Sequence, residues 1–376
     1  MQNNSVRVLV IGMSPQKGGI ESLLMHFFRN TDREKVQFSL LTFCPKCVYE
    51  SEIQSFGIPV YHITRRGVNP IKNYTELTEF YKAHAEEYDF IWYHLSSASN
   101  CLPVTLAKKY TNAKIICHSH GTAFESNPLV RPIHSVLDKI NYPKLMRATD
   151  ICFACSQAAG KWLFKNTDKP IHIVRNGTDT SQFRFNAEKR AAIRESLGIF
   201  ASQPVLGHAG RFCEAKNHTF LLEIFCEVCR DLPDCILLLA GEGELQTAME
   251  EKAKALGISQ KVRFLGFRSD FADLLQGMDL FCMPSLYEGL PLTVVEAQAA
   301  GVPCLLSDTI PKECAITDIV SFLSLEQSAA AWAKEIQTLL TRNLERARYA
   351  DCVKNKGYDI FDTVAEVTDY FCENVV

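Results

Sequence analysis

Residues 280–300, LFCMPSLYEGLPLTVVEAQAA, hold the pattern that decides the fold. The apolar run Leu280–Met283 has the length of a buried strand, and helical spacing begins after one loop and continues over Leu292–Ala300. A strand that leads directly into a helix is the building unit of a parallel sheet. Pro291 suits the first turn of this helix, where its missing N–H is not needed, and Gly289 lets the backbone approach a ligand closely.

The same alternation of strand and helix runs along the whole chain. Short apolar runs rich in β-branched residues are separated by segments of helical spacing. The expected strands are Val6–Ile11, Val36–Phe43, Pro59–Ile63, Phe90–Tyr93, Lys114–Cys117, Ile151–Ala154, Ile171–Val174, Val205–Ala209, Ile236–Ala240, Val262–Leu265, Leu280–Met283 and Pro303–Leu306. This rhythm is typical of parallel sheets covered by helices on both faces. We therefore expect an α/β fold of two doubly wound, Rossmann-like domains.

The length and one irregular stretch indicate where the domains divide. At 376 residues the chain is too long for one hydrophobic core. Residues 176–186 carry Gly, Thr, Asp and Ser without periodicity, so we place the crossover there. We expect a first domain at 1–180, a second at 187–350, and a helical segment at 351–376 that packs back toward the first. Two such domains would form a cleft, with ligands at the carboxyl ends of the strands.

The composition excludes several classes of protein. Hydrophobic residues make up 47% of the chain, aromatic residues 10% and charged residues 22%, which fits a soluble globular protein and not a disordered or fibrous one. No apolar run approaches the roughly eighteen residues of a membrane-spanning helix. Residues 1–11 do not have the pattern of a signal peptide. We therefore expect a cytoplasmic protein.

Fifteen cysteines raise the question of disulfides or metal binding. A cytoplasmic chain of this size does not need disulfides. Three pairs have the CxxC spacing, Cys44/Cys47, Cys152/Cys155 and Cys226/Cys229, but no matching cluster of ligands accompanies them. We interpret the cysteines as reduced thiols of the core rather than as zinc or redox sites.

The charge is unevenly shared along the chain. Residues 1–187 hold 22 basic and 15 acidic residues, whereas the remainder holds 18 basic and 28 acidic residues. The basic first half suggests contact with something anionic, such as a membrane surface or a lipid phosphate at the inner face of the membrane. A scattered, solvated surface explains the same counts equally well. Nucleic acid is not expected, because no basic–aromatic motif is present and the isoelectric point is about 6.4.

Two motifs of the second half carry the chemistry. Glu288 precedes the helix that follows Leu280–Met283, and Glu296 lies about a turn and a half into it, so both can accept hydrogen bonds from sugar or ribose hydroxyls. The helix N-terminus itself suits a phosphate. Arg211 and Lys216 follow the expected strand Val205–Ala209 and together suit a diphosphate. The alternatives are a buried turn with one capping carboxylate and a pair of surface cations, and we favour the ligand site.

The first half offers two weaker signals. Gly18 and Gly19 lie in the segment Lys17-Gly18-Gly19-Ile20-Glu21 at a helix start, which fits turn geometry and ligand approach equally. The segment His118-Ser119-His120-Gly121-Thr122 ends an expected strand, and the spacing does not choose between its two histidines. Such a histidine is ordinarily structural. No carboxylate or thiolate lies near enough in the sequence to suggest a metal site, and none is expected.

Together these motifs resemble the retaining family 4 glycosyltransferases of the GT-B fold, in particular bacterial enzymes of capsular and exopolysaccharide synthesis. The resemblance covers nearly the whole chain. The matching motifs are the glycine pair Gly18-Gly19, HSHxT at His118–Thr122, NGxD at Asn176–Asp179, GR-x4-K at Gly210–Lys216 and E-x7-E at Glu288–Glu296. Thr178 replaces the more frequent valine of NGxD, a change that we expect to matter little.

The resemblance implies a nucleotide-sugar donor bound mainly by the second domain. Arg211 and Lys216 would hold the diphosphate and stabilise its growing charge as the glycosidic bond breaks. Glu296 would bind the ribose hydroxyls and Glu288 the hydroxyls of the donor sugar. His120 would line the sugar pocket from the first domain. Further donor contacts are expected at Gly18, Gly19, Gly210, Gly241, Phe267, Arg268, Gly289, Leu290, Pro291 and Leu292.

The implied activity is transfer of a sugar, with retention, from a nucleotide diphosphate sugar, UDP-linked by preference, to a saccharide that is itself lipid-linked. The family is thought to use the departing phosphate as the base, so no metal and no cofactor are expected. Two other functions remain open: a UDP-sugar epimerase or hydrolase on the same fold, and a saccharide-binding protein without catalysis. Peripheral membrane contact would take place through the basic first domain.

Overall fold

The computed structural model describes residues 5–16, 18–121, 131–165 and 167–375. The chain forms two compact units, Met1–Asn176 with Ile360–Val376, and Gly177–Asp359. The division falls four residues before the boundary expected from the sequence, and the last segment joins the first unit from Ile360 rather than from 351.

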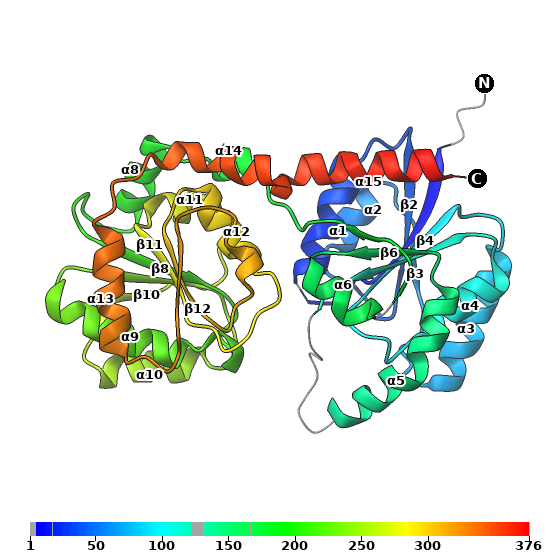
Figure 1. The fold of residues 1–376 in the computed structure, drawn as a ribbon, viewed down its shortest axis with the longest axis horizontal. Coiled ribbons are helices and arrows are strands. Elements are labelled where there is room, and N and C mark those ends of the chain that lie inside the picture. Colours follow the sequence, from blue (N-terminus) through cyan, green and yellow to red (C-terminus); the bar gives the residue numbers. More distant parts are fainter. Residues whose placement is uncertain (1–4, 17, 122–130, 166, 376) are drawn as a thin grey trace. The chain divides into compact units, whose positions relative to one another are not determined.

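The first unit is a seven-stranded parallel sheet in the order β3-β2-β1-β4-β5-β6-β7, with helices on both faces (Figure 1). Its strands are β1 Val6–Ile11, β2 Val36–Thr42, β3 Val60–His62, β4 Phe90–Leu95, β5 Lys114–Ser119, β6 Ile151–Ala154 and β7 Ile171–Ile173. Its helices are α1 Gly19–Asn30, α2 Glu50–Ser55, α3 Pro70–Ala83, α4 Leu102–Tyr110, α5 Arg131–Ala148, α6 Gln157–Phe164 and α15 Ile360–Asn374.

The second unit is a six-stranded parallel sheet in the order β10-β9-β8-β11-β12-β13. Its strands are β8 Val205–Ala209, β9 Ile236–Ala240, β10 Val262–Phe264, β11 Leu280–Met283, β12 Cys304–Ser307 and β13 Val320–Leu323. Its helices are α7 Thr180–Phe183, α8 Ala187–Ser196, α9 His218–Asp231, α10 Gln246–Ala255, α11 Phe271–Gly277, α12 Leu292–Ala299, α13 Ala329–Leu340 and α14 Tyr349–Val353. Two doubly wound sheets confirm the expected fold class.

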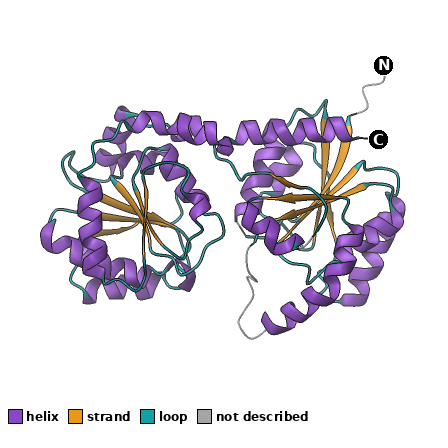
Figure 2. Cartoon of the chain, viewed as in Figure 1, coloured by secondary structure: helices purple, strands orange, loops and turns teal. Residues whose placement is uncertain are grey.

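Each sheet is buried on both faces between helices (Figure 2). For this reason the central strands read as continuous apolar runs, such as ILLLA in β9, all of whose residues are buried. Strand β13 was not expected from the sequence. Its four residues are only half-buried at the sheet edge, so its hydrophobic signal is short and weak.

Some of the helices begin at a residue whose side chain accepts a hydrogen bond from one of the first N–H groups. Asn69 accepts a hydrogen bond from the backbone of Lys72 at 3.0 Å, and Ser156 accepts one from Ala159 at 3.1 Å. Asn186 caps α8 in the same way, so the stretch 176–186 ends in a defined helix start although its sequence shows no periodicity. Capping therefore fixes where the crossover segment stops.

The last helix, α15, completes the core of the first unit. Its Phe371 packs on Phe90 and Trp92, with ring centroids 5.2 and 5.6 Å apart. Inside the second unit, the backbone N–H of Thr178 donates to the carbonyl oxygen of Tyr358 at 2.9 Å. This bond joins the segment by which the chain enters the second unit to the segment by which it leaves. The core of the first unit is thus closed by residues almost three hundred positions away in the sequence.

The cysteines are free thiols, and nine of the fifteen are buried. Burial raises the pKa of Cys47 to about 12 and that of Cys152 to about 11. A thiol with so high a pKa is not a ready nucleophile or metal ligand. The structure is therefore consistent with core cysteines at these CxxC positions.

Candidate active site

The loops that follow β8 and β11 meet at the carboxyl edge of the second sheet. Strand β8 pairs with β9 on one side and with β11 on the other, so the order of the sheet reverses between β8 and β11. A reversal of this kind leaves room for a ligand between the two outgoing loops. Leu286 donates its N–H to Ala215 at 2.8 Å, and the Asn217 amide donates to Pro284 at 3.1 Å. These bonds hold the loops side by side.

The expected cation and carboxylate are brought into direct contact there. Lys216 Nζ donates to Glu288 Oε1 at 2.7 Å, and both side chains are largely buried. The stem of Lys216 passes over Gly210, where an added Cβ would lie 3.0 Å from Lys216 Cε. Arg211 is exposed, and no ion pair of its side chain is recorded within the described part of the chain. The structure therefore offers one paired and one available cation at this edge.

Helix α12 begins at this edge, with Pro291 in the cap position and not, as the sequence suggested, in the first turn. No side chain caps the helix, and the Pro291 carbonyl accepts the N–H of Val294 at 3.0 Å. Glu296 lies further along the same helix, and burial raises the pKa of its carboxyl to about 7. A carboxylate at this position is poised between its two protonation states near neutral pH.

Two neighbouring loops extend the edge past β9 and β10. Gly241 has φ +138°, and an added Cβ would lie 2.0 Å from the carbonyl oxygen of Gly210, so only glycine allows the two loops to touch. Phe267 is exposed on the next loop. Arg268 is held by two hydrogen bonds to Asp270, at 2.7 and 2.6 Å, and this contact lowers the pKa of the Asp270 carboxyl. Part of the donor capacity of Arg268 is thus already in use.

The glycine pair of the first unit lies at the start of α1. Gly18 is the cap residue of this helix, and an added Cβ there would lie 2.7 Å from Glu21 Oε2. Glu21 is buried and accepts the backbone N–H of Ser14 at 3.1 Å, which fixes the loop after β1. Nothing lies within 4 Å of the position of a Cβ on Gly19. Lys17 and Thr122, which belong to the expected motifs, are outside the described residues.

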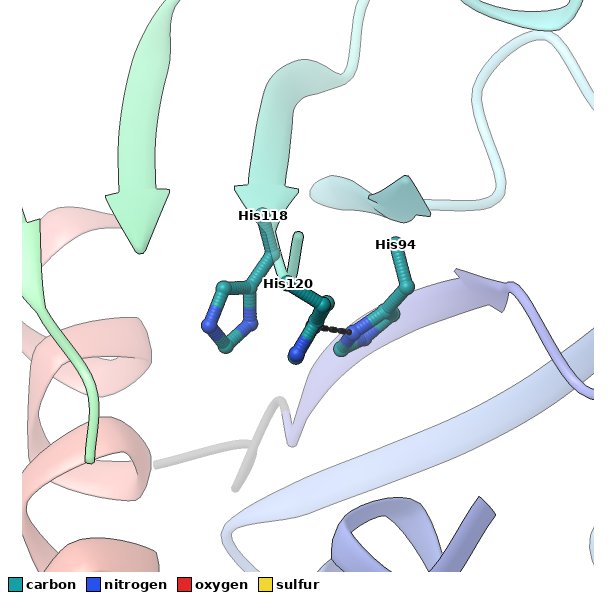
Figure 3. A group of neighbouring side chains, drawn as sticks. All are labelled: His94, His118 and His120. Carbon is teal, nitrogen blue, oxygen red and sulfur yellow. Dashed lines mark hydrogen bonds between the residues drawn. The ribbon is translucent and has the colours of Figure 1, made fainter. Parts of the chain in front are cut away.

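The histidines of HSHxT lie beside a third histidine that the sequence interpretation missed. His94, at the end of β4, is in register with His118 of β5. His94 Nδ1 and His120 Nε2 are hydrogen-bonded at 2.8 Å, as Figure 3 shows. The ring centroids of His118 and His120 are 4.1 Å apart, and those of His94 and His120 are 5.0 Å apart. The pairing of adjacent strand ends, and not the sequence spacing, assembles this cluster.

Burial keeps the three histidines neutral. Desolvation lowers the pKa of His120 to about 3 and the pKa values of His94 and His118 well below their ordinary value. Four ring nitrogens are buried without a hydrogen-bond partner, namely Nε2 of His94, both nitrogens of His118 and Nδ1 of His120. In the His94–His120 bond one nitrogen carries the proton, so the tautomer of His94 decides whether Nδ1 of His120 donates or accepts.

This cluster is also the group of described residues that could hold a metal ion. One ring nitrogen of each histidine lies within 4.8 Å of the others. Three nitrogen ligands are the number that a catalytic zinc site uses. The rings of His94 and His120, however, are stacked at 25° and joined by a hydrogen bond, whereas ligands of one ion converge on a point. The geometry fits a hydrogen-bonded histidine network better than a metal centre.

The two doubly wound units define the class of fold, which is the GT-B type. HepE of Anabaena, solved in complex with UDP and glucose, is 18% identical and superposes with a TM-score of 0.74 over 97% of this chain and 99% of its own. WaaG, a glycosyltransferase involved in lipopolysaccharide biosynthesis, superposes with a TM-score of 0.71 at 16% identity, over 97% of this chain and 99% of its own.

The sequence comparisons then give the family. The model for glycosyl transferases group 1 matches residues 189–356, and the model for Glycosyltransferase Family 4 matches residues 17–182. The putative glycosyltransferase EpsF of Bacillus subtilis is 30% identical over 99% of this chain and 97% of its own length. The chain belongs to the family 4 glycosyltransferases. A further relative, the Escherichia coli UDP-Gal:alpha-D-GlcNAc-diphosphoundecaprenol alpha-1,3-galactosyltransferase, is 23% identical over all of this chain and 98% of its own.

No helix among the described residues is long and apolar enough to cross a membrane.

Proposed function

We propose that this glycosyltransferase moves a sugar, with retention, from a UDP-sugar to a lipid-linked saccharide in the synthesis of an exopolysaccharide, capsule or related glycan. The observation that carries the proposal is the pairing of Lys216 with Glu288 between β8 and β11, where the strand order of the second sheet reverses. The UDP complex of HepE supports the choice of UDP. The lipid diphosphate named for the Escherichia coli relative supports a lipid-linked acceptor.

The diphosphate of the donor is proposed to lie against Arg211, Lys216 and the start of α12. A phosphate oxygen would replace the Glu288 carboxylate as the partner of Lys216, because both are anions that can accept from the same ammonium group. Glu288 would then be released to accept from hydroxyls of the donor sugar. Binding of the diphosphate is in this way coupled to the opening of the sugar subsite.

The rest of the donor is proposed to follow the same edge of the sheet. Glu296 would accept the ribose hydroxyls, which requires its ionised form. The Phe267–Arg268 loop would contact the base, with the backbone as the source of polar groups because Arg268 is engaged by Asp270. Backbone contacts are proposed for Gly210, Gly241, Gly289, Leu290, Pro291 and Leu292.

The first unit is proposed to contribute Gly18, Gly19 and His120. His120 would line the sugar subsite, and His94 would fix its ring orientation and tautomer through the 2.8 Å hydrogen bond. His94 is therefore a positioning residue in this scheme. It carries no charge to the substrate, since its pKa is far below neutrality.

The proposed reaction takes place on one face of the sugar. The anomeric C–O bond to the diphosphate breaks, the acceptor oxygen forms a new bond to the anomeric carbon, and the acceptor proton passes to the departing phosphate oxygen. Arg211 and Lys216 stabilise the charge that develops on the leaving group. This scheme needs no metal ion and no cofactor. The protein is proposed to work at the cytoplasmic face of a membrane, with its first unit in peripheral contact.

Two measurements test the proposal. Isothermal calorimetry is expected to show binding of UDP by the intact protein and a loss of at least tenfold in affinity for Lys216→Ala, in line with the loss of a charge-assisted contact worth about 1.5–3 kcal/mol. Turnover of a UDP-sugar is expected only when a saccharide acceptor is added. Isomerisation of the donor without acceptor would favour an epimerase, and absence of nucleotide binding would favour a saccharide-binding protein.

A further inference from the structure

The second unit has a cavity at the edge of its sheet where the strands begin. Its volume is about 350 Å³, which is within the range of pockets that take small molecules. Pro204 comes directly before β8, Asp279 before β11 and Pro303 before β12, and all three residues line the cavity. The loops of the candidate active site follow the opposite ends of β8 and β11. The cavity is therefore separate from that site.

Positive charge predominates among the side chains that line this cavity. Its charged lining residues within the described chain are Arg190, Arg342, Arg346 and Asp279. Asp279 Oδ1 accepts a hydrogen bond from Arg190 at 2.6 Å, and Asp279 Oδ2 accepts one from the buried Arg194 at 2.6 Å. This one carboxylate thus already contacts two guanidinium groups. Arg342 and Arg346 have no carboxylate partner in the cavity.

Arg346 is half-buried, and its hydrogen bonds go to backbone carbonyls. Its Nε donates to Ala300, just past α12, at 3.1 Å, and three further bonds of 3.0–3.4 Å reach carbonyls at the end of α11. Such helix ends supply only a partial negative charge. Burial, and next the charge of Arg190, lower the pKa of Arg346 to about 9, although Asp279 acts in the opposite direction. The guanidinium of Arg346 therefore lacks a full counter-charge.

The three lining arginines keep N–H groups that the described chain does not use. An arginine side chain offers five N–H donors. The four hydrogen bonds of Arg346 leave one of its donors over, and the bonds of Arg190 involve Nη1 and Nη2 but not Nε. Arg342 is exposed, and no partner of its guanidinium is recorded within the described residues. Glu345, the acidic residue nearest to it in the sequence, does not line the cavity. Unused donors from α8, from the turn after α13 and from the segment before α14 thus line one cavity.

We propose that this cavity binds the phosphate group of a small molecule, with Arg190, Arg342 and Arg346 donating to the phosphate oxygens. The planar fork of a guanidinium matches phosphate oxygens in pairs. A phosphate monoester carries a charge of roughly −1.5 to −2 at pH 7, more than the single charge of a carboxylate, and so supplies the counter-charge that the arginines lack. The inference does not depend on the proposed function, because the cavity and the donor loops lie at opposite edges of the sheet.

Calorimetry of the full-length protein with inorganic phosphate tests the site, with acetate at equal ionic strength as the comparison. The wild type is expected to bind phosphate and not acetate, and to bind phosphate also when saturating UDP is present. Arg342→Gln is expected to lower the phosphate affinity about tenfold, the value of one charge-assisted hydrogen bond, and Arg342→Glu to abolish binding. Arg342 is exposed, so both variants are expected to fold, which circular dichroism checks.

The matched control is Arg348→Gln, which removes the same charge from a residue that pairs with Asp318 at 3.4 Å and does not line the cavity. This variant is expected to bind phosphate as the wild type does.

Hydrogen exchange read by mass spectrometry locates the bound phosphate. With UDP present, phosphate is expected to slow exchange in residues 341–348. Protection confined to residues 210–217 and 285–291 would place the phosphate in the donor site and overturn the proposal. The proposal is also overturned if the wild type does not bind phosphate, or if Arg342→Gln and Arg342→Glu bind it normally. If UDP does not bind while phosphate binding still depends on Arg342, the proposed function fails and the phosphate site stands.

Discussion

The two sheets of this protein share one strand order and differ in what they place at the reversal point. In both, the first strand of the unit pairs with the second on one side and with the fourth on the other, β1 and β8 holding equivalent positions. At the edge of the second sheet stand Arg211, Lys216 and Glu288, all charged. At the edge of the first stands a cluster of histidines that burial keeps neutral. The topology decides where a site can form, and the side chains of the loops decide its chemistry.

The largest expected effect comes from removing the charges of the second edge. Arg211→Ala and Lys216→Ala are each expected to lower kcat about a hundredfold, roughly 3 kcal/mol of lost transition-state stabilisation. Steady-state kinetics with a saturating donor measures this. Circular dichroism and thermal melting serve as the control for folding. Unchanged turnover in both variants would show that the charged edge does not hold the leaving group.

The second expected effect is a pH dependence that arises at the edge of the second sheet and not at the edge of the first. Glu296 has a pKa raised to about 7, and ribose hydroxyls bind its ionised form, so UDP affinity is expected to fall about tenfold from pH 8 to pH 6. The histidines of the first edge stay neutral over this range because their pKa values are lowered. Calorimetry at three pH values measures the effect. In Glu296→Gln, whose side chain cannot ionise, only the titration of the nucleotide itself should change the UDP affinity with pH. An equally steep fall of UDP affinity in this variant would contradict the assignment of the pH dependence to Glu296.

A smaller effect is expected from the first edge. His94→Leu removes the hydrogen bond that orients His120 and is expected to lower kcat/KM roughly fivefold to tenfold, the value of one hydrogen bond of about 1 kcal/mol. UDP affinity should not change, because His94 belongs to the other unit. His94→Asn keeps a donor and an acceptor and is expected to restore part of the loss. A fall in UDP binding, or no rescue by Asn, would argue that the residue acts only through folding.

The smallest expected effect is that of a chelator. The proposed reaction uses cationic side chains in place of a metal, so incubation with EDTA is expected to leave turnover within about twofold. Loss of activity with EDTA that Zn²⁺ restores in the wild type, but not in His118→Ala, would instead show that the cluster of His94, His118 and His120 holds an ion. The edge of the first sheet would then carry the charge of the ion, and the contrast between a charged and a neutral edge would no longer hold.

Local sequence patterns predicted much of the fold. Each central strand is a short apolar run, and helix starts carry Asn, Ser or Pro, because these features depend on neighbours in the sequence. Errors arose where the local signal was weak. Strand β13 is half-buried, and Pro291 proved to be the cap rather than a first-turn residue of α12. His94 was missed because nothing in its own segment marks it.

The sequence by itself determined the fold class, the loops that carry Arg211, Lys216 and Glu288, and the excess of basic residues in the first half, since periodicity and motif spacing are local properties. Only the tertiary structure decided that Lys216 and Glu288 are partners, that His94 meets His120, and that arginines of three separate segments line one cavity. Each of these depends on strands and helices far apart in the sequence becoming neighbours. Such contacts are set by the order of strands in the sheet and by how the helices pack on it, and no single segment encodes either.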